Sequence, residues 1–313
     1  MGANCVVICG PTACGKTRLG VRVAACFGGE ILSADSRQVY RGMDIGTGKD
    51  LAEYDNDGSP VPRHLIDIAD PGEIYSLWDY QRDFYQVFTS LLAAGKLPVV
   101  VGGTGLYIEA VLKNYRIPDV PEDAGLRREL MEQAIGQLLA RLEALDPLLL
   151  EQTDVSSKKR VVRSLEVALH ARDHEVRWGL PDPPQVIPLI LAIRIPRPAL
   201  KERIRRRLES RLEEGMIDEV QRLVAAGLSR ERLDLFGMEY AHIGRYLAGE
   251  IPRDTMVEEL YLAICRLAKR QATWFRGMER RGLPVTWLEG ADFEQAREVI
   301  GRQLELGLGP DRE

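Results

Sequence analysis

Cysteine and histidine are scarce in this chain, and their spacing excludes two classes of small domain. The 313 residues include five cysteines and four histidines. They form no CxxC pair and no Cys/His cluster with the spacing of a zinc site. Four of the cysteines stand within the first 26 residues, where small apolar side chains suit close packing. We therefore expect reduced and mostly buried thiols, with neither disulfide bonds nor bound metal at these positions.

Long apolar runs are also missing. No run approaches the roughly 20 residues that a membrane-spanning helix needs. The first ten residues lack the charged segment of a signal peptide. Myristoylation of Gly2 requires Ser or Thr at position 6, where Val6 stands. The sequence therefore predicts a cytoplasmic protein that makes no contact with a membrane.

The charge is unevenly distributed along the chain, whose net charge is −5. Between Lys158 and Arg211, fourteen Lys and Arg stand against six Asp and Glu, an excess of eight positive charges. The remainder of the chain is therefore strongly acidic. A local basic surface on an acidic protein is typical of a polyanion-binding face, but a solvated helix face gives the same pattern. Charge alone leaves both interpretations open.

The first 112 residues alternate between strand and helix patterns, which predicts an α/β fold with a mainly parallel sheet. We expect strands at 4–9, 30–34, 64–68 and 97–103. We expect helices at 17–26, at 76–94 and from 105 onward. Ser76 suits the N-cap of the second helix, and Gly95 suits its end. Ligands of open α/β sheets gather at the carboxyl ends of the strands.

Two proline-rich joints, 117–123 and 179–188, bracket the middle of the chain. The segment 114–182 between them reads as a mostly helical insertion, with helices at 125–145 and 157–171. A return to the sheet is expected at 187–195. The remaining expected elements are a basic helix at 198–226, a helix at 254–280, a strand at 285–289 and a C-terminal helix.

The spacing of Gly10, Gly15, Lys16 and Thr17 is that of a phosphate-binding loop, and it stands between a predicted strand and a predicted helix. In such loops backbone amides and the helix N-terminus cradle phosphate oxygens. Lys16 would neutralise phosphate charge, and the Thr17 hydroxyl would bind Mg²⁺. Most such loops bind ATP or GTP. In proteins that hydrolyse nucleoside triphosphates, another strand usually ends in an Asp that binds the metal. The best candidate for that strand here, VVVGGTG, ends in glycines, which weakens the nucleotide interpretation.

Asp35 follows the second predicted strand and should emerge near the phosphate loop. A carboxylate there can act as a general base, bind a metal or cap the following turn. Its position alone does not separate these roles.

Six segments occur in the same order as in the tRNA dimethylallyltransferase family, also called tRNA isopentenyltransferases, and resemble it across nearly the whole chain. They are GPTACGKT, SADSRQVYRGMDIGTGK, HLIDI, GGTGLYIEAVL, KERIRRRLESRLEEGMIDEV and LAKRQATWFR. The block DSRQVYRGMDIGTGK is highly specific to that family, whereas the phosphate loop is not. GMEYAHIGRYLAGE resembles one bacterial branch, and no C-terminal zinc finger follows.

The resemblance implies a core like that of the P-loop nucleoside-triphosphate hydrolases, formed by residues 1–113 and 183–313. It implies that residues 114–182 form a helical domain that contacts tRNA. The family transfers a dimethylallyl group from dimethylallyl diphosphate to N6 of adenosine 37, immediately 3′ of the anticodon, in tRNAs that read codons beginning with U. The expected cofactor is Mg²⁺, and the expected partner is the tRNA anticodon stem-loop, bound by a monomer.

The resemblance also assigns roles to single residues. The phosphate loop would hold the diphosphate through its residues Gly10, Pro11, Thr12, Ala13, Cys14, Gly15, Lys16 and Thr17. The backbone amides of Thr12 to Thr17 and the forked guanidinium of Arg207 would stabilise the departing diphosphate. Asp35 matches the general base and Thr104 a residue that holds the target adenine, although Thr104 also suits the N-cap of the helix that follows.

Further positions match tRNA contacts of the family. These are Ser36, Arg37 and Gln38 beside the base, and Lys159, Arg160 and Arg163 in the insertion. The last three lie in the basic region found from charge. Many members have Gln-Arg in place of Lys159-Arg160, and some have an arginine near Glu239, so the segment 236–240 is left unassigned.

Other interpretations are less consistent with the sequence. A nucleotide or small-molecule kinase would explain the phosphate loop but not the block 35–49. A non-catalytic RNA-binding protein would not need Lys16, Thr17 and Asp35 together, and no DDxxD pair of a terpene-type prenyltransferase is present. In the helix around 267–281, we expect Leu267, Trp274 and Met278 to pack inside the protein while the basic side chains face water.

Overall fold

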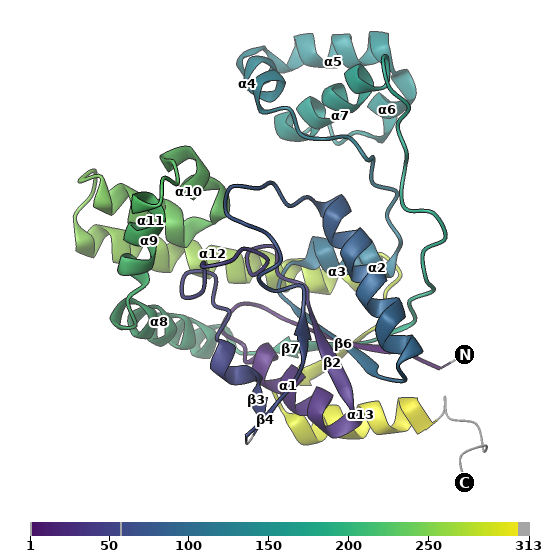
Figure 1. The fold of residues 1–313 in the computed structure, drawn as a ribbon, viewed down its shortest axis with the longest axis vertical. Helices are drawn as coiled ribbons and strands as arrows, with labels where there is room; N and C mark the ends of the chain where they lie inside the picture. The colour runs from purple at the N-terminus through teal and green to yellow at the C-terminus, as the bar shows by residue number, and fades with distance from the viewer. Residues whose placement is uncertain (1, 57, 306–313) are drawn as a thin grey trace. The chain divides into compact units, whose positions relative to one another are not determined.

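The computed structural model describes residues 2–56 and 58–305 (Figure 1). The chain divides into two compact units: a core unit, Met1–Lys113 with Pro184–Glu313, and an insertion, Asn114–Pro183. The core unit contains a sheet with the strand order β5-β2-β6-β1-β7-β8, in which all neighbours are parallel. Its strands are β1 (Cys5–Cys9), β2 (Gly29–Ser33), β5 (Arg63–His64), β6 (Leu97–Gly102), β7 (Pro188–Arg194) and β8 (Val285–Glu289). The predicted α/β fold with a mainly parallel sheet is confirmed.

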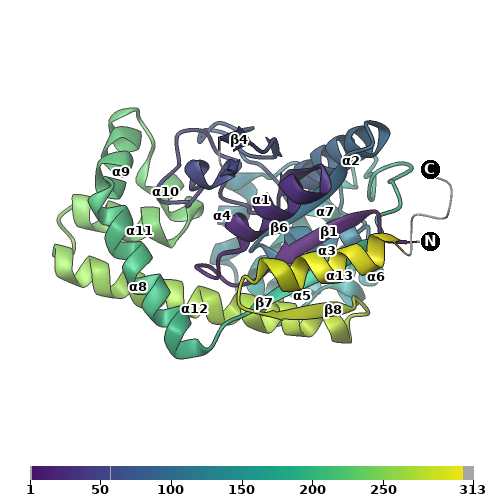
Figure 2. The ribbon, with the colours of Figure 1, turned by 90° about the horizontal axis from the view of Figure 1, so that it is seen from below.

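Both faces of the sheet are covered, which explains why its central strands are continuous apolar runs. Helices α1 (Lys16–Phe27) and α13 (Phe293–Glu305) lie side by side over one face, where alternate residues such as Val6 and Val99 point (Figure 2). The intervening residues point to the other face. There α2 (Leu77–Ala93) and α3 (Gly105–Leu112) pack against β6.

Helix α2 begins as expected from its sequence. The Ser76 hydroxyl accepts a hydrogen bond from Asp79 N, and the Asp79 carboxylate accepts one from Ser76 N, forming a capping box. Gly95, with φ +66°, follows the end of the helix. The predicted helix at 76–94 is confirmed to within a residue or two.

The predicted strand at 64–68 is wrong beyond its first residue. Leu65 (φ +63°) and Asp67 (φ +56°) adopt left-handed backbone conformations, which cannot continue an extended strand. The chain before this point also forms a 3₁₀ turn, η1 (Leu51–Tyr54), and a small hairpin of β3 (Asp55–Asn56) with β4 (Ser59–Pro60).

The chain after β7 forms more and shorter helices than predicted. The expected helix at 198–226 is two helices, α8 (Arg197–Glu213) and α9 (Met216–Ala225), because Gly215 (φ +98°) breaks the chain between them. Two helices that were not predicted follow, α10 (Arg230–Phe236) and α11 (Met238–Leu247). They pack with α12 (Arg253–Arg280) and α9 around a separate apolar cluster.

The insertion is a compact helical unit. It contains α4 (Ala124–Glu132), α5 (Ile135–Leu145), α6 (Pro147–Gln152) and α7 (Lys158–His170) around their own small apolar cluster. The expected single helix at 125–145 is wrong, because Gln133 and Ala134 are extended and separate α4 from α5.

The cysteines are free thiols, as expected, and Cys5, Cys9 and Cys14 are buried whereas Cys26 is exposed. Burial raises the pKa of Cys5 to about 12. Within 2–56 and 58–305, no group of three or more His, Cys, Asp and Glu side chains could hold a metal by itself. None of the described helices is long and apolar enough to span a bilayer.

Candidate active site

The phosphate loop joins the end of β1 to the start of α1, as predicted. Ala13 (φ +61°) and Gly15 (φ +89°) turn the backbone before Lys16, the first residue of α1. A Cβ at Gly10 would lie 2.9 Å from the buried sulfur of Cys14, so the loop needs a glycine there to close on itself. The loop therefore presents backbone amides and a helix N-terminus at the carboxyl edge of the sheet.

Cations without a described acidic partner lie over this loop, Lys16 and Arg207 among them. Lys16 and Arg207 both line a cavity of about 360 Å³ and an adjoining one of about 490 Å³. Neither forms an ion pair with any residue that the structure describes, whereas Arg205, Arg206 and Arg211 on the same helix each pair with an acid.

The burial of Arg207 has an electrostatic consequence. Burial, and secondarily the nearby charge of Arg211, lower the pKa of Arg207 to about 10. A desolvated guanidinium without a counter-ion favours the binding of an anion. Arg207 is thus available to a diphosphate, and so is Arg203, which lines the smaller cavity and pairs with no described acid.

Thr17 lines the smaller cavity together with the carboxylates of Asp50 and Glu53. Burial, followed by the charge of Asp50, raises the pKa of Glu53. Hydroxyl and carboxylate oxygens are suitable ligands for Mg²⁺, which usually takes one or two protein ligands and completes its shell with phosphate oxygens and water. The donor set therefore fits a hard divalent cation bound together with a diphosphate.

Asp35 lies just beyond the end of β2 and lines the larger cavity with Lys16, Thr17, Thr104 and Arg207. Its Oδ1 accepts a hydrogen bond from Arg37 N at 3.0 Å, so the turn-capping role considered from sequence is real. This bond uses one carboxylate oxygen and orients the group. The fold thus brings together the three residues predicted to be catalytic.

Thr104 occupies the N-cap position of α3, but its side chain does not cap that helix. Its Oγ1 instead accepts a hydrogen bond from Ser36 N at 3.1 Å. The two strand ends approach so closely that a Cβ at Gly102 would clash with the carbonyl of Ala34. Thr104 therefore fixes the backbone beside Asp35.

The other residues of the core unit that are predicted to contact tRNA differ in whether their side chains are exposed or already hydrogen-bonded within the protein. The Arg37 side chain is exposed and donates a hydrogen bond to the carbonyl of Leu235. Gln38 accepts from Ser33 Oγ at 3.1 Å and donates to the carbonyl of Gly48 at 3.0 Å. Gln38 thus holds the loop that carries Gly48, a structural role that was not anticipated.

Within the family-specific block 35–49, residues 40–49 are held by two buried ionic side chains. Lys49, which is fully buried, contacts the carbonyl of Tyr40 and the carboxylates of Asp44 and Asp67. The carboxylate of Glu219 accepts hydrogen bonds from the backbone of residues 44–46 at 2.8–3.0 Å. These contacts bring the loop that contains Gly48 against Arg207 and Arg211.

Gln271 of α12 is a site residue that the sequence interpretation missed. Thr12 N donates a hydrogen bond to Gln271 Oε1 at 2.8 Å, and Gln271 Nε2 donates to the carbonyl of Gly103 at 3.0 Å. The amide of Thr12 is therefore engaged by Gln271 in this structure, and its role as a donor to the diphosphate stays a prediction. Only the neighbouring RQxTW pattern could have drawn attention to Gln271.

Helix α12 also corrects the expectation for its aromatic residues. Met278 and Phe275 are buried, but Leu267 and Trp274 line the larger cavity beside Arg270. The Trp274 ring lies against Gly105, where a Cβ would clash with it. Its buried Nε1 has no hydrogen-bond partner among the residues described, so Trp274 forms a wall of the cavity rather than only filling the interior.

Glu239 at the start of α11 lines the same cavity. Burial raises its pKa, although Arg211 and Arg207 act in the opposite direction. The segment that the sequence left unassigned thus contributes a second carboxyl group to the cavity.

Within the insertion, Lys159 and Arg160 are exposed on α7, and Arg160 pairs with Asp154. Arg163 instead contacts the buried carboxylate of Glu166 and donates to the carbonyl of Val120 at 2.8 Å. The donors of Arg163 are engaged inside the insertion, which gives this residue a structural role.

Comparisons with known proteins agree with this arrangement. The sequence model of the family described as IPP transferase matches residues 38–278. The chain belongs to the IPP transferase family. It is 48% identical to tRNA dimethylallyltransferase 1 of Syntrophus aciditrophicus over 97% of this chain and 99% of that protein. It is 50% identical to tRNA dimethylallyltransferase 1 of Geotalea daltonii over 92% of this chain and 91% of that protein.

Solved structures of IPP transferases have the same fold. The full-length tRNA isopentenylpyrophosphate transferase of Bacillus halodurans is 34% identical, with a TM-score of 0.69 over 97% of both chains. A eukaryotic dimethylallyltransferase acting on tRNA is 21% identical, with a TM-score of 0.77 over 99% of this chain and 81% of that one. The second likeness concerns the fold alone.

Proposed function

We propose that this IPP transferase moves a dimethylallyl group from dimethylallyl diphosphate to N6 of adenosine 37 in tRNAs that read codons beginning with U. Diphosphate is the other product. The observation that carries the proposal is a cavity lined by Asp35, Thr104 and cations without a described acidic partner, among them Lys16 and Arg207. A diphosphate and the base it alkylates need this combination of an anion site and a proton acceptor.

The cations act on the leaving group. As the allylic C–O bond breaks, negative charge builds on the diphosphate oxygens. Lys16, Arg207 and the backbone amides of residues 13–17 are fixed near that charge before the reaction, so they stabilise it without reorganisation. When bound, Mg²⁺ neutralises further diphosphate charge, and Thr17 is the residue that would hold it.

The carboxylate acts on the nucleophile. The exocyclic amine of adenine loses a proton as its nitrogen bonds to the allylic carbon, and Asp35 accepts that proton. Its bond to Arg37 N leaves the other oxygen to face the amine. Thr104 and the wall formed by Trp274 hold the base in place.

Adenosine 37 must leave the anticodon-loop stack to enter the cavity, which costs a few kcal/mol and is easier in a loop than in a duplex. We assign the remaining affinity to phosphate contacts of exposed cations, with Lys159 and Arg160 of the insertion among them. We expect the protein to act as a monomer. tRNA and prenyl diphosphates are both cytoplasmic substrates, which supports a cytoplasmic location.

The test is an incubation of labelled donor, Mg²⁺ and an unmodified anticodon stem-loop with adenosine after the anticodon. Label should pass from dimethylallyl diphosphate to the RNA, and not to a stem-loop with guanosine at that position. A parallel reaction with γ-labelled ATP should give no transfer. Consumption of ATP without prenyl transfer would make the protein a kinase and refute the proposal.

A further inference from the structure

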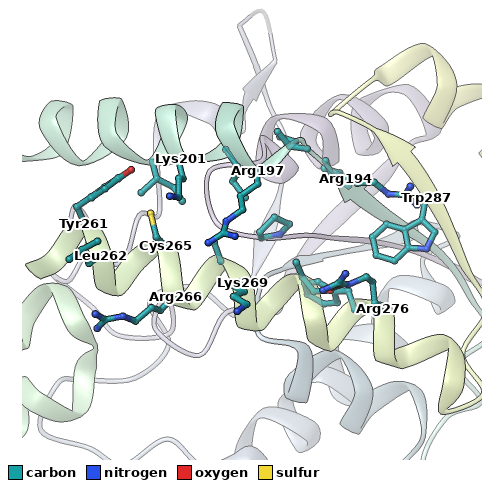
Figure 3. A pocket seen from close by; sticks show the side chains of 18 of the residues that line it. Arg194, Arg197, Lys201, Tyr261, Leu262, Cys265, Arg266, Lys269, Arg276 and Trp287 are labelled. Atoms are coloured by element: carbon teal, nitrogen blue, oxygen red, sulfur yellow. Dashed lines mark hydrogen bonds between the residues drawn. The ribbon is translucent and has the colours of Figure 1, made fainter. Parts of the chain in front are cut away.

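A third cavity in the core unit shares no lining residue with the two active-site cavities, although Pro11 of the phosphate loop lines it. It has a volume of about 910 Å³ and runs between α8, α12, the end of β7 and the middle of β8 (Figure 3). On α12 it is lined by residues such as Cys265, Lys269 and Arg276, whereas the active-site cavity is lined by Gln271 and Trp274 of the same helix. The two cavities therefore use different faces of α12.

The floor of this groove is apolar. Branched aliphatic and aromatic side chains from both helices and both strands form it, including Ile193, Ile204, Leu262, Phe275 and Trp287. Leu262 is 47% exposed, which leaves a large apolar side chain in contact with water. Burying such a surface against an apolar ligand is favourable by roughly 25 cal/mol for each Å² removed from water.

The rim of the groove is positively charged. Arg197 and Lys201 on α8 stand across from Lys269 on α12, with Arg266 also on α12 (Figure 3). These four exposed cations form no ion pair or hydrogen bond with any described residue. One acid, Glu279, lines the groove.

Single exposed cations without a described acidic partner also occur elsewhere in the core unit, for example Arg18 and Arg253. The distinctive feature here is that four of them surround one groove. An acidic protein that leaves four cations unpaired around one groove favours an anionic occupant. Because α8 and α12 each contribute two of these cations, the groove suits a ligand head group that carries several negative charges.

We propose that this groove binds a prenyl diphosphate longer than the five-carbon donor, with its chain on the apolar floor and its diphosphate between the α8 and α12 cations. The volume falls within the roughly 300–1,000 Å³ of small-molecule pockets, which are mostly apolar with a few polar groups. A nucleic acid strand would use the cations but leave the apolar floor without a matching surface. The proposal concerns binding alone and stands apart from the proposed reaction.

The probe is farnesyl diphosphate, titrated calorimetrically into the full chain without RNA. Arg266→Ala/Lys269→Ala should weaken its binding at least tenfold and leave binding of dimethylallyl diphosphate unchanged. Lys16→Ala should do the reverse, because Lys16 lies in the other cavity. Arg297→Ala/Arg302→Ala, which removes two paired cations from α13, is the matched control and should change neither affinity.

The two parts of the ligand can be tested separately. In the Lys16→Ala background, dimethylallyl diphosphate and farnesol should each bind the groove at least tenfold more weakly than farnesyl diphosphate. Absence of farnesyl diphosphate binding, or binding lost in Lys16→Ala and kept in Arg266→Ala/Lys269→Ala, would overturn the proposal. So would displacement of farnesyl diphosphate by an anticodon stem-loop that needs Arg266 and Lys269, because RNA would then be the occupant.

Discussion

The backbone N–H of Thr12 donates a hydrogen bond to Oε1 of Gln271 at 2.8 Å, across 259 residues of sequence. The side-chain nitrogen of the same glutamine, Gln271 Nε2, donates to the carbonyl of Gly103 at 3.0 Å. Gln271 thus joins the loop that should hold the diphosphate to the loop that carries Thr104. In the proposed reaction these loops hold the two reacting molecules, so their separation sets the distance between the allylic carbon and N6.

We therefore predict that Gln271→Glu lowers kcat by about 10- to 100-fold. A carboxylate can still accept from Thr12 N, but it cannot donate to Gly103 and would face that carbonyl with a negative charge. Losing a buried hydrogen bond and leaving its partner unsatisfied costs about 1–3 kcal/mol. Steady-state prenyl transfer, with KM for each substrate, measures the effect.

The matched control for this prediction is Gln86→Glu, which makes the same change on an exposed position of α2. It should leave kcat unchanged. If Gln271→Glu keeps wild-type kcat while its melting temperature falls, Gln271 stabilises the fold without positioning the loops.

We predict that Asp35→Asn reduces kcat by a factor of hundreds or more and leaves tRNA affinity nearly unchanged. Asparagine keeps an oxygen that can accept from Arg37 N, so the turn at 35–37 should persist. The substitution thus removes the proton acceptor while preserving the local structure. Single-turnover transfer and RNA binding should be measured on the same preparation. Wild-type turnover by the variant would remove Asp35 from the mechanism.

Local signals in the sequence were sufficient for the phosphate loop, the sheet and α2. Each depends on neighbouring residues: the spacing of Gly10 and Lys16, the apolar run of β1, and the capping box at Ser76. The same reasoning failed at Gly215, which ends α8, because a single glycine inside a helical pattern does not reveal its φ angle. It failed at 64–68 because the apolar residues of this segment do not reveal that Leu65 and Asp67 adopt left-handed conformations.

Long-range contacts could not be predicted in the same way. Arg163 lies in a basic run that suits RNA binding, yet it contacts Glu166 and Val120 inside the insertion. Gln271 and Thr12 meet only because α12 passes the carboxyl edge of the sheet. The resemblance to a family could assign Asp35 and Arg207, but it carried no information about which amides and cations are already engaged.

We predict that inorganic diphosphate with Mg²⁺ raises the melting temperature of the wild-type protein, and that Arg207→Gln removes most of this shift. A ligand that binds only the folded state stabilises it by RT ln(1 + L/Kd), where L is the free ligand concentration, so weaker binding gives a smaller shift. Arg207 has a desolvated guanidinium without an acidic partner, so the diphosphate supplies its counter-ion. Arg205→Gln, which changes an arginine of the same helix that pairs with Glu258 and lines neither active-site cavity, is the control. An equal diphosphate shift in Arg207→Gln and wild type would contradict the assignment.

A prediction about pH follows from Glu239, whose pKa is raised above its ordinary value of 4.5 mainly by burial. In the folded protein this carboxyl binds a proton at pH values where the unfolded chain has released it. The free energy of unfolding therefore falls as the pH rises from about 4.5 through the raised pKa. In Glu239→Gln this loss should be absent. The melting temperature of the variant minus that of the wild type should therefore rise across this pH range and stay constant above it. The exposed Glu213→Gln is the control, and parallel curves for Glu239→Gln and wild type would refute the prediction.

The last prediction concerns the insertion. Lys159→Glu/Arg160→Glu should weaken tRNA binding at least tenfold and reduce the slope of log K against log salt by roughly one to two, because each phosphate contact contributes about 0.7–0.9 to that slope. Both side chains are exposed, and neither contributes to the apolar cluster of the insertion, so folding should be retained. The matched control reverses two exposed cations outside the basic region, Arg297→Glu/Arg302→Glu on α13. The measurement is tRNA binding across a salt series. Equal slopes for the insertion variant and the wild type would place the RNA-binding surface elsewhere. A reduced slope in the α13 control alone would place that surface on α13.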